Sequence, residues 1–111
     1  MSTFKFIEKP WGYEKIIEKN DKYVMKELFM KEGNQCSLQY HEKKHETVYV
    51  ISGKLKLTIE GKESVLHPGF TISIPPNTVH RMKAITDTLY LEASTPELDD
   101  VVRLKDDYNR G

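Results

Sequence analysis

The sequence predicts an all-β domain built as a sandwich or a barrel. Short segments rich in β-branched and aromatic residues recur between residues 23 and 93. Glycine, proline, asparagine and aspartate separate these segments at regular intervals, and no amphipathic stretch is long enough for a substantial helix. Such spacing is typical of antiparallel strands that pack face to face or close into a barrel.

Eight segments have the composition and the alternation of strands. They are, in chain order, residues 23–30, 35–41, 47–51, 54–59, 63–66, 70–74, 79–84 and 88–93. Residues that favour or fix the φ angle of a turn lie between them. These turns are Asn20-Asp21, Glu32-Gly33-Asn34, Ser52-Gly53, Glu60-Gly61-Lys62, His67-Pro68-Gly69, Pro75-Pro76-Asn77 and Thr86-Asp87. Residues 96–104 fit either a short helix or an extended segment.

Length and charge limit the possible functions. The 111 residues suit one domain spanning residues 1–111. Lysine plus arginine equal aspartate plus glutamate at 17 each, so neither nucleic acid nor a membrane is expected as a partner. The N-terminal residues contain no long apolar run, and the single cysteine, Cys36, cannot form an internal disulfide. These features predict a cytoplasmic protein in which Cys36 is a buried side chain rather than a nucleophile.

Alternation along the strands indicates which polar side chains face inward. Ser37, Gln39 and His41 form a polar row on one face of their segment, which fits either a solvated face or a cavity wall. Glu46 precedes two valines at alternate positions, and His80 precedes a methionine and an alanine at alternate positions. A carboxylate and an imidazole in line with apolar residues both need buried partners, and a shared metal ion satisfies both.

The sequence therefore predicts a divalent metal site formed by Gln39, His41, Glu46 and His80. Imidazole and carboxylate groups suit zinc first, with manganese, iron and nickel as alternatives. His45 competes as a ligand, but its position next to Glu46 directs it to the opposite face. A further histidine in the turn before Pro68 is expected to face solvent.

The residues that carry this pattern resemble the two-part signature of the cupin superfamily. They are Gly33, His41, Glu46 and Gly53, followed by Gly69, Pro75, Asn77 and His80. The resemblance implies a double-stranded β-helix, a jelly-roll-like barrel of two antiparallel sheets with a metal in its mouth. Dimers formed through N-terminal strands are common in the superfamily. Because residues 23–30 carry apolar side chains on both faces, we expect a homodimer.

Four longer segments are similar to the type II mannose-6-phosphate isomerase cupin, a module that usually follows a mannose-1-phosphate guanylyltransferase domain. These segments are residues 9–14, 37–41, 74–81 and 99–108. The 111 residues leave no room for the guanylyltransferase domain, so guanylyl transfer is not expected of them. The resemblance implies a metal-dependent aldose–ketose isomerase that acts on a sugar phosphate.

One position departs from the cupin signature. Lys43 stands where the signature carries a second histidine, and a lysine ammonium is not a metal ligand at neutral pH. Type I mannose-6-phosphate isomerases, to which the Gln-x-His pattern is similar, bind zinc through a glutamine, two histidines and a glutamate. The resemblance thus implies Gln39 as the replacement ligand.

Isomerisation of a sugar phosphate also needs a base and a cationic clamp for the phosphate. Lys26 shares a strand face with apolar residues and is a candidate for both catalysis and substrate binding, although its head group also fits a surface position or an ion pair. Arg81 and Arg103 lie in family-like segments and are candidate phosphate ligands, with surface ion pairs as the alternative. Glu92 is the candidate base.

Three functions remain open on the sequence alone. The first is a stand-alone sugar-phosphate isomerase. The second is a non-haem iron oxygenase, because His41, Glu46 and His80 also amount to the two histidines and one carboxylate of that chemistry. The third is a sugar- or effector-binding cupin without catalysis, which the lysine at position 43 favours.

Overall fold

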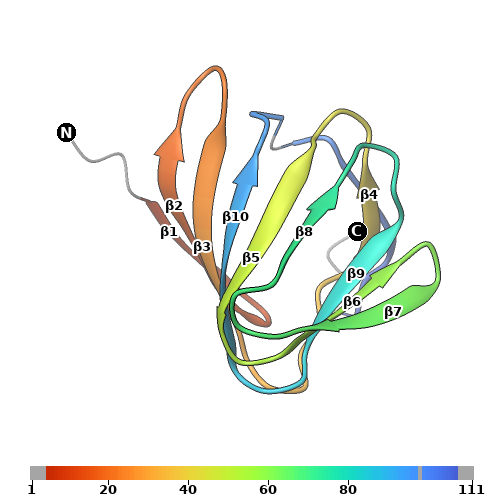
Figure 1. Ribbon diagram of the computed structural model, residues 1–111. Helices are drawn as coiled ribbons and strands as arrows, with labels where there is room; N and C mark the ends of the chain where they lie inside the picture. Colours follow the sequence, from red (N-terminus) through yellow and green to blue (C-terminus); the bar gives the residue numbers. More distant parts are fainter. Residues whose placement is uncertain (1–4, 98, 108–111) are drawn as a thin grey trace.

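A computed structural model describes residues 5–97 and 99–107; Leu98 and Tyr108, which belong to the C-terminal stretch considered above, lie outside them. Within these ranges the chain forms eleven strands and no helix (Figure 1). The strands are β1 (Lys5–Lys9), β2 (Gly12–Lys19), β3 (Val24–Met30), β4 (Leu38–His41), β5 (Glu46–Ser52), β6 (Leu55–Ile59), β7 (Lys62–Leu66), β8 (Thr71–Ile74), β9 (His80–Ala84), β10 (Thr88–Ser94) and β11 (Val101–Lys105). The described residues include no helix long and apolar enough to cross a membrane.

The strands form two antiparallel sheets that face each other. One sheet has the order β1-β2-β3-β10-β5-β8, and the other has the order β11-β4-β9-β6-β7. Consecutive strands repeatedly change sheets, as β3 and β4 or β9 and β10 do. This arrangement confirms the predicted double-stranded β-helix.

All eight predicted strands are present, with shifted ends. Residues 35–37 are not part of a regular strand, and β5 begins at Glu46. The sequence analysis missed β1 and β2, and it left open the C-terminal stretch, of which Val101–Lys105 is the strand β11. The pairing of β2 with β3 shifts between Ile16 and Glu18, so the side-chain alternation by which strands are recognised is interrupted there.

The hydrophobic core fills one half of the space between the sheets. Its buried side chains come mainly from β3, β5, β6 and β9, and include Leu28, Val48, Leu55, Leu57 and Met82. The turn between β5 and β6 needs a glycine, because a Cβ on Gly53 would lie 2.2 Å from the carbonyl oxygen of Asp87. The other part of the space is a cavity lined by charged and apolar side chains, and it holds the site described below.

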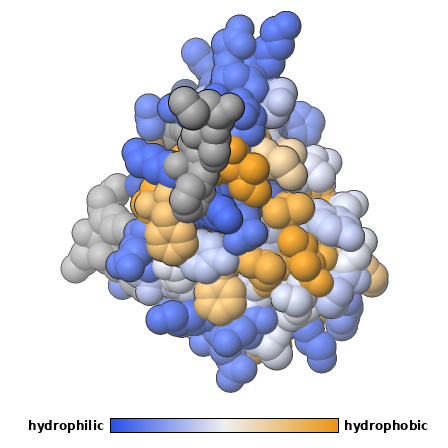
Figure 2. Space-filling model, turned by 90° about the vertical axis from the view of Figure 1, so that its left-hand side faces the viewer, coloured by the Kyte–Doolittle hydropathy of each residue, from blue (hydrophilic) through white to orange (hydrophobic). Residues whose placement is uncertain are grey.

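The outer face of the six-stranded sheet is unusually apolar. Phe6, Tyr13 and Phe29 form a row of aromatic rings, with centroids 4.9 Å and 5.6 Å apart. Met25 and Ile51 are also exposed on strands of this sheet. Figure 2 looks onto the side of the molecule that carries β1 to β3 and shows apolar side chains gathered between hydrophilic ones.

Candidate metal centre

Three side chains from three strands meet between the two sheets. His41 ends β4, Glu46 begins β5 and His80 begins β9, and all three are buried. Their ligand atoms lie within 4.8 Å of one another. Glu46 Oε1 is 3.6 Å from His41 Nε2 and 3.3 Å from His80 Nε2. Three of the four predicted metal ligands are therefore brought together.

The three facing atoms fit a metal ion better than they fit one another. His41 Nε2, Glu46 Oε1 and His80 Nε2 are buried and have no hydrogen-bond partner among the described residues. Ligands bound about 2.1 Å from a common ion lie roughly 3–3.5 Å apart, close to the spacing observed here. A bound divalent cation would satisfy all three groups at once.

The outer nitrogen of each imidazole is held in place. His41 Nδ1 lies 3.3 Å from Asp100 Oδ1, and His80 Nδ1 lies 2.8 Å from the carbonyl oxygen of Thr78. Both partners accept a hydrogen bond, so each Nδ1 carries the proton and each Nε2 presents its lone pair to the centre of the site. This is the usual arrangement of metal-binding histidines.

Backbone hydrogen bonds fix the loops that carry these ligands. The Asn77 N–H donates to the carbonyl oxygen of His41, which ties the turn before β9 to the end of β4. Asn77 has a left-handed backbone, with φ 59°, as its place in a turn after two prolines suggests. Asp100 Oδ2 accepts the backbone N–H groups of Lys43 and Lys44, 2.6 Å and 3.0 Å away.

Gln39, the fourth predicted ligand, lies beside this group. It is on the same strand face as His41, is paired across the sheet with His80, and lines the same cavity. Its Oε1 accepts a 2.6 Å hydrogen bond from the hydroxyl of Ser37. Gln39 is thus positioned at the site with its oxygen already engaged, and its role as a ligand stays a proposal.

The other histidines and Lys43 lie outside the site. His45, Lys43 and His67 are all exposed, as was expected of the two histidines. Cys36 lines the cavity, and burial raises the pKa of its thiol to about 11. The thiol is therefore protonated at neutral pH, in agreement with a structural role for Cys36.

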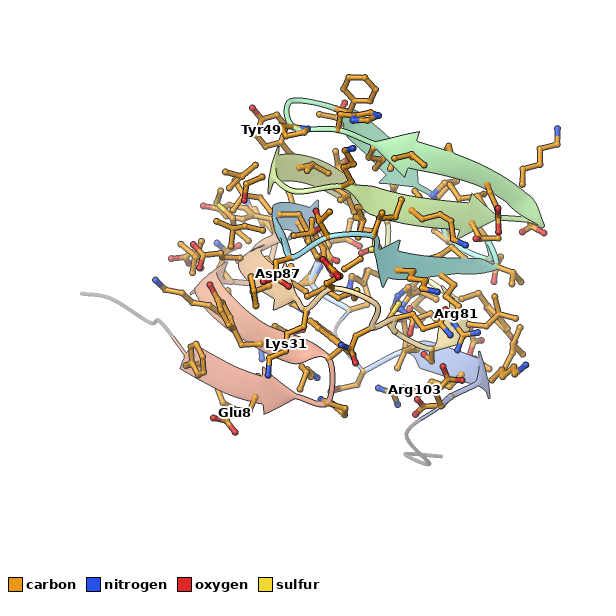
Figure 3. The ribbon with its side chains drawn as sticks, turned by 90° about the horizontal axis from the view of Figure 1, so that it is seen from below. Glu8, Lys31, Tyr49, Arg81, Asp87 and Arg103 are labelled. Atoms are coloured by element: carbon orange, nitrogen blue, oxygen red, sulfur yellow. The ribbon has the colours of Figure 1, made fainter. Side chains whose placement is uncertain are left out.

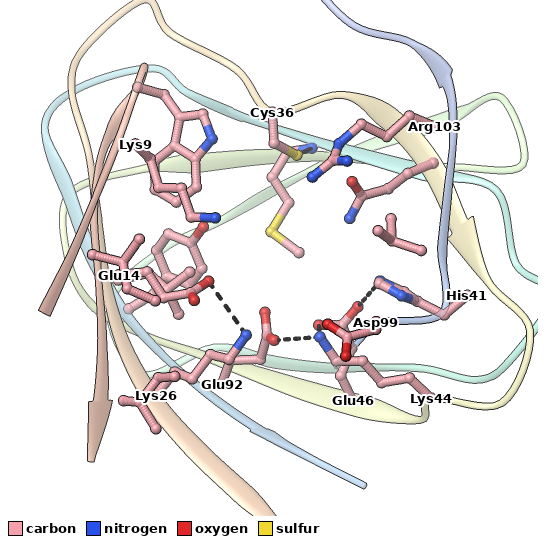
Figure 4. Close-up of a pocket in the computed structure, with 18 of the residues that line it drawn as sticks. Lys9, Glu14, Lys26, Cys36, His41, Lys44, Glu46, Glu92, Asp99 and Arg103 are labelled. Carbon is pink, nitrogen blue, oxygen red and sulfur yellow. Dashed lines mark hydrogen bonds and ion pairs between the residues drawn. The ribbon is translucent and has the colours of Figure 1, made fainter. Parts of the chain in front are cut away.

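Lys44 is the principal site residue that the sequence analysis did not identify. Lys44 is only 5% exposed, and its ammonium is 2.9 Å from Glu92 Oε1 and 3.7 Å from Glu46 Oε2. Farther along the same wall, the Lys26 ammonium is 3.3 Å from Glu14 Oε1. Acidic and basic groups alternate along the wall that leads to the metal ligands (Figure 4).

These charges set the protonation of the site. Burial, together with the charges of Lys44 and His80, lowers the pKa of His41 to about 4. Burial and the neighbouring charge of Glu92 raise the pKa of Glu46 to about 7. Burial opposes ionisation of Glu92 as well, but the Lys44 ammonium outweighs it and holds the pKa of Glu92 far below its usual range.

His80 and Glu46 compete for one proton. Burial disfavours the charged imidazole, yet the carboxylate of Glu46, 3.3 Å from Nε2, and the hydrogen bond to the Thr78 carbonyl outweigh it and raise the pKa of His80. Because the two groups interact directly, they titrate as a pair rather than separately.

The ligands open into a cavity of about 600 Å³. Its walls come from β1, β2, β3 and β10 on one side and from β4, β9 and β11 on the other. Basic side chains outnumber acidic ones around it; they are Lys5, Lys9, Lys19, Lys26, Lys44 and Arg103 against Glu14, Glu46, Glu92 and Asp99. The cavity therefore suits a polar ligand with an anionic group.

The two arginines proposed for phosphate binding differ in position (Figure 3). Arg103 lines the cavity, and its buried Nε has no hydrogen-bond partner among the described residues. Arg81 does not line it: its Nε donates to the carbonyl oxygen of Cys36, and its Nη2 lies 3.2 Å from Asp107 Oδ1. Since neighbours on a strand face opposite ways, the inward direction of His80 places Arg81 on the other face. The structure therefore does not bring Arg81 into this cavity together with Arg103.

Comparison with known proteins agrees with this geometry. Residues 26–93, more than half of the chain, match the family described as "Cupin domain". The chain belongs to the cupin family. The strands β1, β2 and β11 of this cupin lie outside the matched range. Glu14 on β2, Arg103 on β11 and Asp100, which directly precedes β11, therefore come from outside it.

Curated relatives of this cupin are longer proteins. It is 33% identical to the mannose-1-phosphate guanylyltransferase of Escherichia coli over 94% of its own length and 23% of the relative. It is 28% identical to the alginate biosynthesis protein AlgA of Pseudomonas aeruginosa, again over 94% of its length and 23% of the relative. The cupin thus spans about a quarter of the length of these relatives.

Solved structures confirm the fold. KdgF from Halomonas sp. superposes with a TM-score of 0.80 at 23% identity, covering 86% of this cupin and 89% of that chain. CapF, the capsular polysaccharide assembling protein of Staphylococcus aureus, superposes with a TM-score of 0.76 at 18% identity, covering 92% of this cupin and 34% of that chain.

Proposed function

We propose that this cupin is a metal-dependent isomerase of a sugar phosphate, of the mannose-6-phosphate isomerase type. The observation that carries the proposal is the set of three unpartnered atoms on His41, Glu46 and His80, which lie within 4.8 Å of one another at a cavity in which basic side chains outnumber acidic ones. Supporting it are sequence relatives whose names include a mannose phosphate, and the resemblance of four segments to the isomerase cupin.

His41, Glu46 and His80 would hold the ion, and Gln39 is the proposed fourth ligand. A bound zinc or similar divalent ion supplies a Lewis acid that polarises the carbonyl of the open-chain sugar. Arg103 is the proposed phosphate ligand, because its guanidinium has an unpartnered Nε beside the cavity and a shape suited to phosphate. Lys26 adds positive charge, although Glu14 already shares its ammonium.

Glu92 is the proposed proton acceptor. Its carboxylate lies in the cavity wall, and the ammonium of Lys44 keeps it ionised at neutral pH. The same ion pair makes Glu92 a weak base. We therefore propose that an oxygen of the bound substrate attracts the Lys44 ammonium away from Glu92. Without the nearby positive charge, the carboxylate of Glu92 becomes basic enough to accept a proton from the substrate.

The direct test combines metal analysis with an assay. Protein purified without added metal is analysed for zinc, manganese, iron and nickel, and is then assayed for conversion of mannose 6-phosphate to fructose 6-phosphate. We expect a divalent metal at one equivalent and turnover that a chelator removes. A metal-loaded protein that does not convert the sugar phosphate contradicts the proposal.

A second function is favoured by one observation, the composition of the metal cluster. Two histidines and one carboxylate, the groups that converge here, are also the ligands of non-haem iron oxygenases. Iron in the purified protein, together with oxygen consumption in the presence of a small organic acid, would favour this function over isomerisation. Binding of the sugar phosphate without turnover would favour a non-catalytic sugar-binding cupin.

A further inference from the structure

The buried ion pair of Lys44 and Glu92 touches the metal site without belonging to it. Lys44 and Glu92 are 5% and 6% exposed, and their charged atoms are 2.9 Å apart. Lys44 is also 3.7 Å from Glu46 Oε2. A permanent positive charge therefore lies next to the carboxylate that would bind a cation.

The two oxygens of Glu46 face different partners. Oε1 faces the Nε2 atoms of His41 and His80, whereas Oε2 lies 3.7 Å from the ammonium of Lys44. The carboxyl groups of Glu46 and Glu92 also interact with each other. A glutamate can bind a divalent ion through one oxygen or through both. With Oε2 directed toward Lys44, only Oε1 is directed at the metal position.

We propose that Lys44 and Glu92 are positioning residues that control how Glu46 binds the metal. Lys44 holds Oε2, so that Glu46 ligates through Oε1 alone and a coordination position stays open for substrate. Glu92 in turn holds Lys44, so that the ammonium does not bind Glu46 more closely and compete with the metal. This inference rests on the metal site of the proposed function.

The distances indicate the order of these contacts. Lys44 is 0.8 Å closer to Glu92 than to Glu46, so Glu92 is its main partner. If Glu92 loses its charge, Glu46 becomes the nearest carboxylate to the ammonium. If Lys44 and Glu92 both become neutral, no positive charge competes with the metal ion for Glu46. Oε2 can then bind the ion together with Oε1.

Two variants are expected to act in opposite directions. In E92Q the ammonium of Lys44 turns to Glu46, and Co²⁺ affinity should fall by about tenfold. In K44M/E92Q the competing charge is gone, and Co²⁺ affinity should rise above that of the wild type by about tenfold. K44M/E92Q removes both charges of the ion pair, so neither charge is left buried without a partner. The double variant should therefore still fold.

The experiment is a titration of the metal-free wild type, E92Q, K44M/E92Q and K44R with Co²⁺, followed by visible absorption. Binding of Glu46 through both oxygens adds a ligand, so K44M/E92Q should show weaker d–d bands than the wild type. K44R keeps the positive charge and should keep the wild-type spectrum. K43M is the matched control, because the Lys43 side chain is exposed and should not change affinity or spectrum.

The outcomes separate this inference from the proposed function. A wild type that binds no Co²⁺ overturns the metal site and this inference with it. A wild type that binds Co²⁺, with E92Q and K44M/E92Q both weakened and spectra unchanged, overturns the inference alone. That pattern is what a purely structural ion pair predicts.

Discussion

Asp100 Oδ1 lies 3.3 Å from His41 Nδ1, across 59 positions of sequence. The carboxylate orients the imidazole and keeps its proton on Nδ1, and such contacts typically contribute about 10–100-fold to metal affinity. We therefore expect D100N to weaken binding of Zn²⁺ within that range, measured by competition with a chromophoric chelator.

The control for this variant is D107N. Asp107 is on the same C-terminal segment and is also hydrogen-bonded, but to Gln35 and Arg81 rather than to a ligand of the site. Equal losses in D100N and D107N would show that the effect comes from general loosening of the C-terminal strand.

His41, at the end of β4, and His45, in the loop that follows, should differ as metal ligands. His41 is buried within the cluster, whereas His45, four residues later, is exposed. H41A should therefore lower metal content sharply, while H45A should retain it, as measured by metal analysis after dialysis. Loss of metal in H45A with retention in H41A would contradict the assigned cluster.

Metal affinity should depend on pH around neutrality. The pKa of Glu46 is raised to about 7 without metal, and His80 shares its proton. The metal binds the deprotonated forms, so below pH 7 binding must release a proton, and affinity should fall on the order of tenfold per pH unit. Above pH 7 this proton is already absent and the dependence should flatten. Zn²⁺ titrations from pH 5.5 to 8.5 test this; an affinity constant across that range would contradict it.

The three residues of the candidate metal cluster could be predicted to come together because they lie on strands. Glu46 and His80 share strand faces with buried apolar residues, and a period of two is enough to direct them inward. The same rule places Arg81, the neighbour of His80 on β9, on the opposite face of that strand, away from the cavity.

Lys44 could not be found in this way, because it lies in a loop. Nothing in the order Lys43-Lys44 shows which of the two side chains is buried. The choice is made by the backbone hydrogen bonds of both residues to Asp100, 57 and 56 positions away, and by the carboxylate of Glu92 across the cavity. Contacts over such separations leave no periodic pattern in the sequence.

A homodimer remains a prediction, and the apolar outer face of the six-stranded sheet is its expected interface. Met25 and Ile51 are 36% and 41% exposed there, beside the aromatic row. M25K and I51K should convert the dimer to monomer in sedimentation experiments, because a buried lysine without a partner is unfavourable. V65K is the matched control, since Val65 is 39% exposed on the other sheet. A wild type that is only monomeric at micromolar concentration would end this prediction.

Arg103 should distinguish a sugar phosphate from the corresponding neutral sugar. Its unpartnered Nε lines the cavity, and a charge-assisted contact to phosphate contributes about 1.5–3 kcal/mol. Calorimetric titration should therefore show mannose 6-phosphate binding at least roughly tenfold more tightly than mannose, and R103Q should remove most of this difference. R81Q, which changes an arginine already bound to Cys36 and Asp107, should retain it. Equal affinities of the wild type for mannose 6-phosphate and mannose would contradict the sugar-phosphate function. If R81Q abolishes the difference in affinity and R103Q retains it, the phosphate binds on the other face of β9.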